Sequence, residues 1–317
     1  SASVDIPSWY FADRFKKPSI LYFNKRNLDA LTTDYYNWNH RLLPMIMVFA
    51  GRVDLNSVTS PTQKVWAGEG VTPVVLVHTD WTWSDTDKYL GIKGGKARSS
   101  HAHMDAGSFV YDAYGVRWSM DIGRQDYATL EVALKALGGN LWTYTQASLR
   151  WEVSRLNNFF HSTLTVNDAK HRVEGFATLE QTINTATEQG GTFDLSPVLE
   201  DQVASAMRTV KIVNDKDLKV IDAIRTRTDR SAKIRWTMVT PAAPAVENDR
   251  IVLTSNGKTM YLTAAEEGGT QIVYKTFSTD PVHSYDDPNP GIYLVGFEAT
   301  VPADKWATFT TTLSPGN

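Results

Sequence analysis

The sequence contains no cysteine among its 317 residues. This absence excludes structural disulfides and thiolate metal ligands, and it leaves the cellular compartment open. The phosphate-binding motifs GxGxxG and GxxxxGK[ST] are missing as well, and so is the GxSxG motif of many serine hydrolases. Nucleotide binding is therefore not expected, and any metal site must be built from His, Asp or Glu side chains.

Long apolar runs and a large excess of one charge are absent too. No segment approaches the roughly 20 apolar residues needed to cross a bilayer, so no membrane span is expected. The formal net charge is only −3, which gives no reason to expect a nucleic-acid partner. The first residue is Ser rather than Met, as in a mature form without its signal peptide, and we expect a periplasmic or secreted protein.

The residues that are present change in character near residue 65. Apolar and aromatic residues at three- and four-residue spacing predict two short helices between Leu28 and Ala50, broken near Pro44. Residues 51–70 are rich in Ser, Thr, Pro and Gly and are expected to form a linker. We therefore predict a helical segment with its linker over residues 1–65 and a second domain over residues 66–317.

From residue 71 onward the chain consists of short β-rich runs bounded by turn residues. Asn214-Asp215 and Ser255-Asn256-Gly257 are candidates for hairpin turns, because Asn and Gly tolerate positive φ. Residues 128–156 depart from this pattern and predict a short helix that ends at Gly138-Gly139. The expected fold is mainly β: a large antiparallel β-sandwich preceded by a short helical segment.

The strongest chemical pattern lies in residues 94–127, GGKARSSHAHMDAGSFVYDAYGVRWSMDIGRQDY. In it His101, His103 and Asp105 alternate with small or apolar residues, and an extended backbone would present all three on one face. Such a face can bind a metal or hold a catalytic base. The HxH pattern alone is equally compatible with a solvated loop that carries two histidines by coincidence.

A longer pattern resolves this ambiguity. The run HAHMDAGSF, preceded by LGIKGGKARSS and followed by MDIGRQDY, resembles the heparinase II/III-like domain of polysaccharide lyases. The later run NNFFHSTLTVND is similar to the second histidine-bearing strand of that family. The resemblance implies an α/α toroid followed by a layered β-sandwich, so residues 1–65 would be a remnant of the toroid and residues 66–317 the sandwich domain.

The resemblance also implies a metal site. It assigns the ligands to His103, Asp121 and His161, on three different strands, and zinc suits imidazole nitrogen and carboxylate oxygen. One structural Zn²⁺ that clamps the strands is the expected role, and the alternative is a catalytic ion that activates water. Asp105 is expected to orient a histidine or bond the strand.

Direct chemistry is expected from His101. A lyase acting on a uronic acid must neutralise the C6 carboxylate, remove the C5 proton and protonate the departing O4, and imidazole suits the first two tasks. Tyr127 is the nearest tyrosine candidate, with a packed aromatic as the alternative. The family takes further catalytic residues from the toroid, so the chain is expected to hold only part of an active site.

Basic residues near His101 suggest an acidic polysaccharide as the partner. Arg98 and Arg124 are the candidates for substrate binding, because Arg can grip a carboxylate or sulfate with two parallel hydrogen bonds. The predicted function is therefore β-elimination of a uronic-acid-containing glycan. A zinc-stabilised, non-catalytic glycan-binding module is the alternative, and a metallohydrolase is a third reading.

Overall fold

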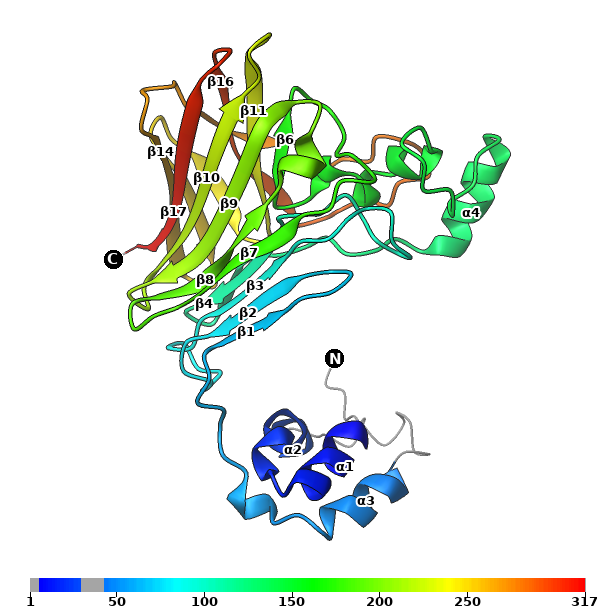
Figure 1. Ribbon diagram of the computed structural model, residues 1–317, viewed down its shortest axis with the longest axis vertical. Helices are drawn as coiled ribbons and strands as arrows, with labels where there is room; N and C mark the ends of the chain where they lie inside the picture. Colours follow the sequence, from blue (N-terminus) through cyan, green and yellow to red (C-terminus); the bar gives the residue numbers. More distant parts are fainter. Residues whose placement is uncertain (1–5, 30–42, 317) are drawn as a thin grey trace. The chain divides into compact units, whose positions relative to one another are not determined.

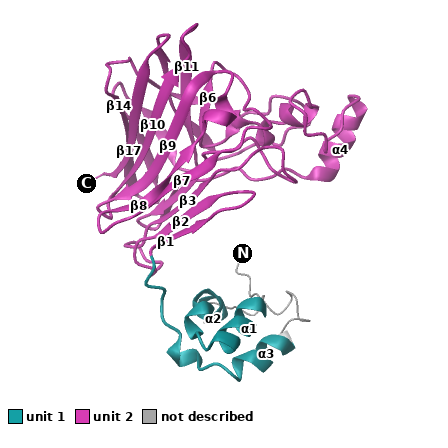
Figure 2. Cartoon of the chain, viewed as in Figure 1, with its two compact units in different colours: residues 1–63 teal, residues 64–317 magenta. Residues whose placement is uncertain are grey.

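The computed structural model describes residues 6–29 and 43–316, and it divides the chain into two compact units. Residues 1–63 form the first unit and residues 64–317 the second (Figure 2). The division falls within two residues of the boundary predicted from the sequence. The assignment of the first unit to a toroid remains a prediction.

The first unit is helical. Its elements are α1 (Ile6–Phe15), η1 (Pro18–Leu21), α2 (Tyr22–Asp29), α3 (Leu43–Ala50) and η4 (Leu55–Ser57). Trp9, Leu21 and Ile46 are buried together in its small core. Helix α3 begins at Leu43, and Pro44 stands at its second position, where its missing N–H leaves no bond unmade. The helix predicted before Pro44, from Leu28 onward, lies largely outside the described residues.

A five-stranded antiparallel sheet begins the second unit, with its strands in sequential order. The strands are β1 (Val65–Gly68), β2 (Val74–His78), β3 (Tyr89–Lys93), β4 (Phe109–Ala113) and β5 (Val116–Ser119). The linker expected over residues 51–70 is therefore wrong at its end, where β1 pairs with β2.

The second sheet has eight antiparallel strands in the order β12-β13-β14-β17-β10-β9-β8-β7. Their bounds are β7 (Thr178–Asn184), β8 (Glu188–Asp194), β9 (Val203–Val213), β10 (Asp217–Thr226), β12 (Ala243–Val246), β13 (Ile251–Ser255), β14 (Lys258–Glu266) and β17 (Trp306–Pro315). A short turn, η8 (Ser196–Leu199), joins β8 to β9. Buried and partly buried residues alternate along β10, as expected for a strand with one interior face.

The third sheet has four antiparallel strands in the order β15-β16-β11-β6. Their bounds are β6 (Leu164–Val166), β11 (Ala232–Thr240), β15 (Val273–Phe277) and β16 (Tyr293–Val301). One hydrophobic core joins the three sheets, with Val75, Val220 and Trp236 each contributed by a different sheet. The mainly β, antiparallel sandwich predicted from the sequence is confirmed (Figure 1).

Two predicted hairpin turns are confirmed by their backbone angles. Asn214 and Asp215 have φ of 54° and 47° between β9 and β10, and Asn256 and Gly257 have φ of 50° and 72° between β13 and β14. Positive φ at both central residues matches the right-handed twist of the flanking strands. These turns therefore set the register of the long strands that form the interior face.

A largely non-β segment projects from one side of the sandwich (Figure 1). It contains α4 (Tyr127–Ala136) and the single turns η5 (Leu149–Glu152), η6 (Ser154–Leu156) and η7 (Asn158–Phe160). Asp126 caps α4 by accepting the Thr129 N–H, and Gly138 follows the helix with φ of 77°, as predicted. No helix in the described part of the chain is long and apolar enough to span a membrane.

Candidate active site and metal centre

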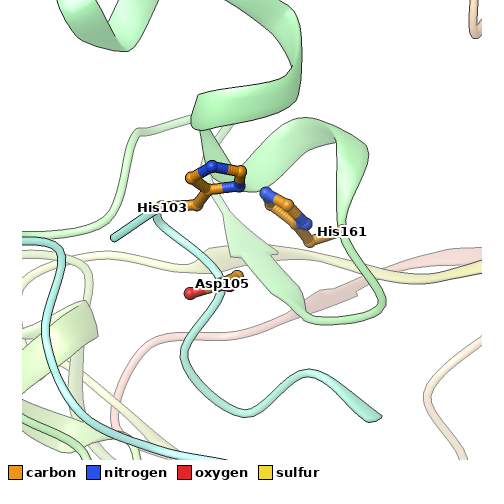
Figure 3. Close-up of side chains that lie close together, drawn as sticks. All are labelled: His103, Asp105 and His161. Atoms are coloured by element: carbon orange, nitrogen blue, oxygen red, sulfur yellow. The ribbon is translucent and has the colours of Figure 1, made fainter. Parts of the chain in front are cut away.

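Two histidines and an aspartate converge where this segment meets the sandwich. His103 and Asp105 lie in the loop between β3 and β4, and His161 lies between η7 and β6. One ligand atom from each of the three lies within 4.8 Å of the others (Figure 3). His103 and His161 are 58 positions apart in sequence and precede strands of two different sheets, β4 and β6, so the packing of these sheets brings them together.

The two histidines have different electrostatic surroundings. Burial lowers the pKa of His103 to about 4, so this ring is neutral near pH 7 and has a lone pair to offer. Burial alone would lower the pKa of His161, but Asp121 outweighs it and raises the pKa. His161 Nδ1 lies 2.7 Å from Asp121 Oδ2, while its Nε2 is buried without a hydrogen-bond partner. An orphaned buried nitrogen facing a second histidine is the position that a metal ion would satisfy.

The two carboxylates of the site occupy different positions. Asp121, a predicted ligand, contacts His161 Nδ1 and also accepts the Gly123 N–H at 2.7 Å. Asp105, which the sequence predicts to orient a histidine or bond the strand, belongs to the cluster itself and accepts two 2.8 Å bonds from Lys93 Nζ. The predicted ligand set His103, Asp121 and His161 stays a prediction, with Asp105 as a fourth candidate that the sequence pattern had already placed near His103.

A buried ion pair braces the backbone on both sides of this cluster. Arg208 and Asp222 are fully buried on neighbouring strands β9 and β10 and form two bonds of 2.7 and 3.0 Å. Arg208 Nη1 also donates to the carbonyl oxygens of Gly107 and Ser162, at 3.1 and 3.3 Å. One guanidinium therefore ties the loop of His103 to the segment of His161.

His101 does not share the face of His103 and Asp105. The expected extended backbone is interrupted by a turn, in which the Ala102 N–H bonds to the Ser99 carbonyl and His101 has a φ of 62°. His101 is exposed, and its ring stacks on Tyr127 at 5.4 Å and meets Trp142 edge-on at 5.2 Å. The structure thus brings the two predicted catalytic side chains together, beside a tryptophan that the sequence did not single out.

The two predicted substrate-binding arginines have different surroundings. Arg124 is exposed, and its guanidinium lies 6.0 Å from the centre of the Tyr127 ring. Within the described residues it forms no ion pair with a carboxylate. Arg98 forms an exposed ion pair with Glu174. Arg124 is therefore free to meet an anion beside Tyr127, whereas Arg98 already has a partner.

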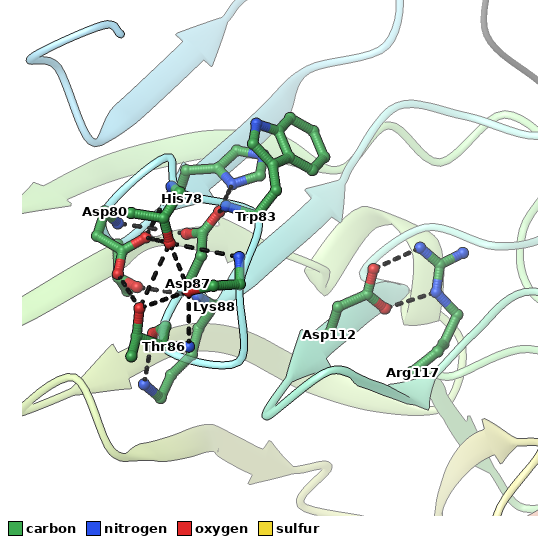
Figure 4. A network of polar contacts seen from close by, with 11 residues as sticks. His78, Asp80, Trp83, Thr86, Asp87, Lys88, Asp112 and Arg117 are labelled. Atoms are coloured by element: carbon green, nitrogen blue, oxygen red, sulfur yellow. Dashed lines mark hydrogen bonds and ion pairs between the residues drawn. The ribbon is translucent and has the colours of Figure 1, made fainter. Parts of the chain in front are cut away.

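A second buried histidine pair lies at the far end of β2. His78 Nδ1 is 2.8 Å from Asp87 Oδ2 (Figure 4). The ring of Trp81 stacks on His78 with the ring centres 4.2 Å apart. Asp87 also accepts the backbone N–H groups of Asp80 and Trp83. These hydrogen bonds hold the loop between β2 and β3 in place, which indicates a structural role.

Comparisons with known proteins agree with this architecture. A family described as "Heparinase II/III-like, C-terminal" matches residues 74–303. The fold is similar to heparan sulfate lyase HepC from Pedobacter heparinus, with a TM-score of 0.62 and 16% identity over 93% of this chain and 42% of that one. It is also similar to a heparinase III structure, with a TM-score of 0.62 and 13% identity over 90% of this chain and 43% of that one.

The chain therefore spans about two fifths of the length of these solved structures. No curated protein matches the sequence.

Proposed function

Because the chain belongs to the heparinase II/III-like, C-terminal family, we propose that it is part of a polysaccharide lyase that cleaves a uronic-acid-containing glycan by β-elimination. The observation that carries this proposal is the stacking of the exposed His101 ring on Tyr127, beside Arg124, which has no carboxylate partner among the residues that the structure describes. These are the three kinds of group that β-elimination from a uronate requires.

The proposed roles follow from position and chemistry. The cationic guanidinium of Arg124 binds the C6 carboxylate and so stabilises the negative charge that develops when C5 loses its proton. His101 takes that proton, and the C5–H electron pair becomes the C4=C5 double bond. The C4–O4 bond breaks, and the Tyr127 hydroxyl gives its proton to O4. Groups from the remainder of the active site, supplied by a toroid, would share these tasks.

The metal in this proposal has a structural role. His103, Asp121 and His161 would hold one Zn²⁺, with Asp105 as the neighbouring carboxylate, and the orphaned Nε2 of His161 supports the fit. When bound, the ion supplies a rigid cross-link between three segments of the chain. The backbone of His101 is two residues from His103, so the cross-link fixes the turn that presents His101 to the substrate. A periplasmic or secreted location is part of the same proposal.

The test is the ultraviolet absorbance of the product. β-Elimination leaves a C4–C5 double bond conjugated with the carboxylate, so heparan, chondroitin and alginate chains incubated with the protein should yield an absorbing product. Tyr127→Phe and His101→Asn should abolish this signal, and Tyr293→Phe, an exposed tyrosine outside the site, should not.

Two results would contradict the proposal. New chain ends whose non-reducing uronate is saturated, without absorbance, would indicate a metallohydrolase instead. Binding of a uronate glycan with no product of either kind, in a protein that includes the full toroid, would indicate the non-catalytic binding module. Replacing Arg124 with Ala should weaken glycan binding, and the loss should shrink as salt is raised.

A further inference from the structure

An open hollow of about 590 Å³ lies beside His101. Trp142 and Tyr144 line it together with two serine hydroxyls and one threonine hydroxyl, and Arg98 and Glu174 face it. Flat aromatic surface next to several hydroxyl groups and one Arg–Glu pair is the composition that suits a sugar ring, which has apolar C–H faces and polar edges. None of the roles proposed above uses Trp142, Tyr144 or Glu174.

The hollow is joined to the proposed catalytic residues by rigid contacts. The Tyr144 hydroxyl accepts the backbone N–H of His101 at 3.2 Å. Trp142 meets the rings of His101 and Tyr127 edge-on at 5.2 and 5.3 Å, and its indole N–H donates to Glu131. Trp142 is nevertheless 39% exposed, which leaves part of the ring free to contact a ligand. A sugar unit in the hollow would therefore adjoin the unit held at His101.

A buried cation contacts two of the aromatic rings that line the hollow. Arg150 is fully buried, and its guanidinium lies 4.7 Å from the ring centre of Tyr144 and 6.0 Å from that of Trp142. It donates to the carbonyl oxygens of Leu141 and Ala102. Across residues 6–29 and 43–316 no carboxylate forms an ion pair with Arg150. Its positive charge therefore remains uncompensated by a negative one, and in a low-dielectric setting it favours an anion nearby.

The Arg98–Glu174 pair is weak by comparison. The two side chains are 60% and 58% exposed, and exposed ion pairs contribute little because solvent screens them and long side chains must be ordered. Glu174 occupies the position on Arg98 that a sugar carboxylate or sulfate would need. An anionic ligand can displace Glu174 at small expense to the fold.

We propose that this hollow binds one anionic sugar unit, carrying a carboxylate or a sulfate, with Trp142 as its stacking surface and Glu174 as an internal competitor for Arg98. The proposal rests on the proposed function for its position along the glycan, because the unit would neighbour the one at His101. It names a second subsite and a residue that limits affinity there. Removing the competitor should therefore strengthen binding.

The experiment measures binding of three small probes to the whole chain by NMR, following the indole N–H signal of Trp142. Methyl glucuronide and glucose 6-sulfate carry the anion, and methyl glucoside is the neutral match. At least one of the two anionic probes should shift the Trp142 signal at a lower concentration than methyl glucoside does. The anionic probe that binds more tightly shows whether a carboxylate or a sulfate is preferred. Glu174→Gln should tighten that probe about two- to fivefold, the range released by losing an exposed ion pair.

Two further variants localise the effect. Arg98→Met should weaken the anionic probe on the order of tenfold, as expected for loss of a charge-assisted bond, and leave the glucoside unchanged. Asp304→Asn is the matched control, because it removes a 56% exposed carboxylate from an arginine outside the hollow. It should change no affinity.

Equal affinity for the neutral and anionic probes would overturn the proposal, as would weaker anion binding in Glu174→Gln. These probes are single sugars without a glycosidic bond at O4, so β-elimination cannot cleave them. The binding result is therefore independent of the lyase assay. A protein that yields no absorbing product yet shows the Trp142 response would contradict only the proposed function.

Discussion

Within the described residues, the buried side chains of His78 and His161 each lie at hydrogen-bond distance from an aspartate. His78 and Asp87 are 2.8 Å apart, and His161 and Asp121 are 2.7 Å apart. In the first pair the aspartate also bonds the backbone of the loop that it closes (Figure 4). In the second, the other histidine nitrogen is buried and unsatisfied.

The two histidines differ in what surrounds the ring nitrogen that does not contact the aspartate. Three aromatic rings, those of Trp81, Trp83 and Tyr89, contact His78, so its surroundings are already filled. The unsatisfied Nε2 of His161 instead has His103 and Asp105 beside it. A buried polar atom without a partner is unfavourable by about 1–3 kcal/mol, and a metal ion would remove that penalty.

The largest loss of stability is expected on replacing Arg208, which bonds the backbone near His161 and not the backbone near His78. Arg208→Met leaves Asp222 buried without its partner and should lower the free energy of unfolding by about 3–5 kcal/mol, or roughly 10 °C in Tm. Chemical unfolding followed by circular dichroism measures it. Zinc affinity should fall as well, because the bonds to the Gly107 and Ser162 carbonyls are lost.

A double variant separates these two consequences. Arg208→Met with Asp222→Leu replaces the ion pair by apolar groups and should recover much of the stability, while zinc affinity stays low because the carbonyl bonds are still missing. Full recovery of zinc affinity in the double variant would show that Arg208 has no positioning role.

Metal removal should distinguish the two pairs directly. If zinc is present at about a hundred times its Kd, chelation should lower the stability of the protein by about 3 kcal/mol. His161→Ala and His78→Ala both remove a buried ring from an aspartate and should both destabilise. Thermal unfolding with and without chelator should show that His78→Ala keeps the chelator response and His161→Ala loses it. A chelator response that survives in His161→Ala would exclude this histidine as a ligand.

A third buried histidine, His171, differs from His78 and His161, because in the described residues its ring bonds to a backbone carbonyl and to no aspartate. His171 Nε2 donates to the Leu164 carbonyl at 2.7 Å, and burial lowers its pKa from 6.5 to about 4. The unfolded chain therefore takes up a proton at a higher pH than the folded one, and stability falls as pH drops from about 6.5 towards 4. The loss from His171 should be about 2 kcal/mol between pH 7 and pH 5.

His171→Gln removes that titration, so urea unfolding across this pH range should show a flatter profile in the variant than in the parent. His103, which is partly buried and also has its pKa lowered to about 4, contributes to both profiles and cancels in the difference. Parallel profiles for the two proteins would mean that His171 titrates normally in the folded state.

Local patterns explain which parts of the fold the sequence predicts well. The hairpins at Asn214-Asp215 and Asn256-Gly257 combine alternating strands with residues that accept positive φ, so both are visible in sequence. Strand β8 is not, because its Gly190 and Gly191 resemble turn residues. In the structure, a Cβ on Gly190 would collide with the Val210 carbonyl of β9, so the glycine permits close strand packing instead.

The candidate site, too, is predictable only where its residues belong to a local sequence pattern. His101, His103, Asp121 and His161 can be predicted as site residues because the motifs that contain them are contiguous runs. Arg208 reads as an ordinary residue of a β-strand, and only the pairing of β9 with β10 places it opposite Asp222 in the interior. The turn that separates His101 from His103 depends on long-range contacts such as the Tyr144 hydroxyl, so the alternating pattern by itself predicted the wrong geometry.

The smallest change in stability is expected at His101, and it is the sharpest test of the division between structural and catalytic histidines. His101 is exposed and has a φ of 62°, a backbone conformation that Asn accepts more readily than most residues, so His101→Asn should change the free energy of unfolding by less than about 0.5 kcal/mol. The chelator response should also be unchanged, because the ring stacks on Tyr127 and is not one of the clustered ligands. Formation of the absorbing product, measured in the protein with its full active site, should nevertheless fall by at least about a hundredfold, the usual contribution of a general base. A variant that loses stability or zinc would place His101 with His103 and His161, because only a residue that supports the metal centre would change those two readouts.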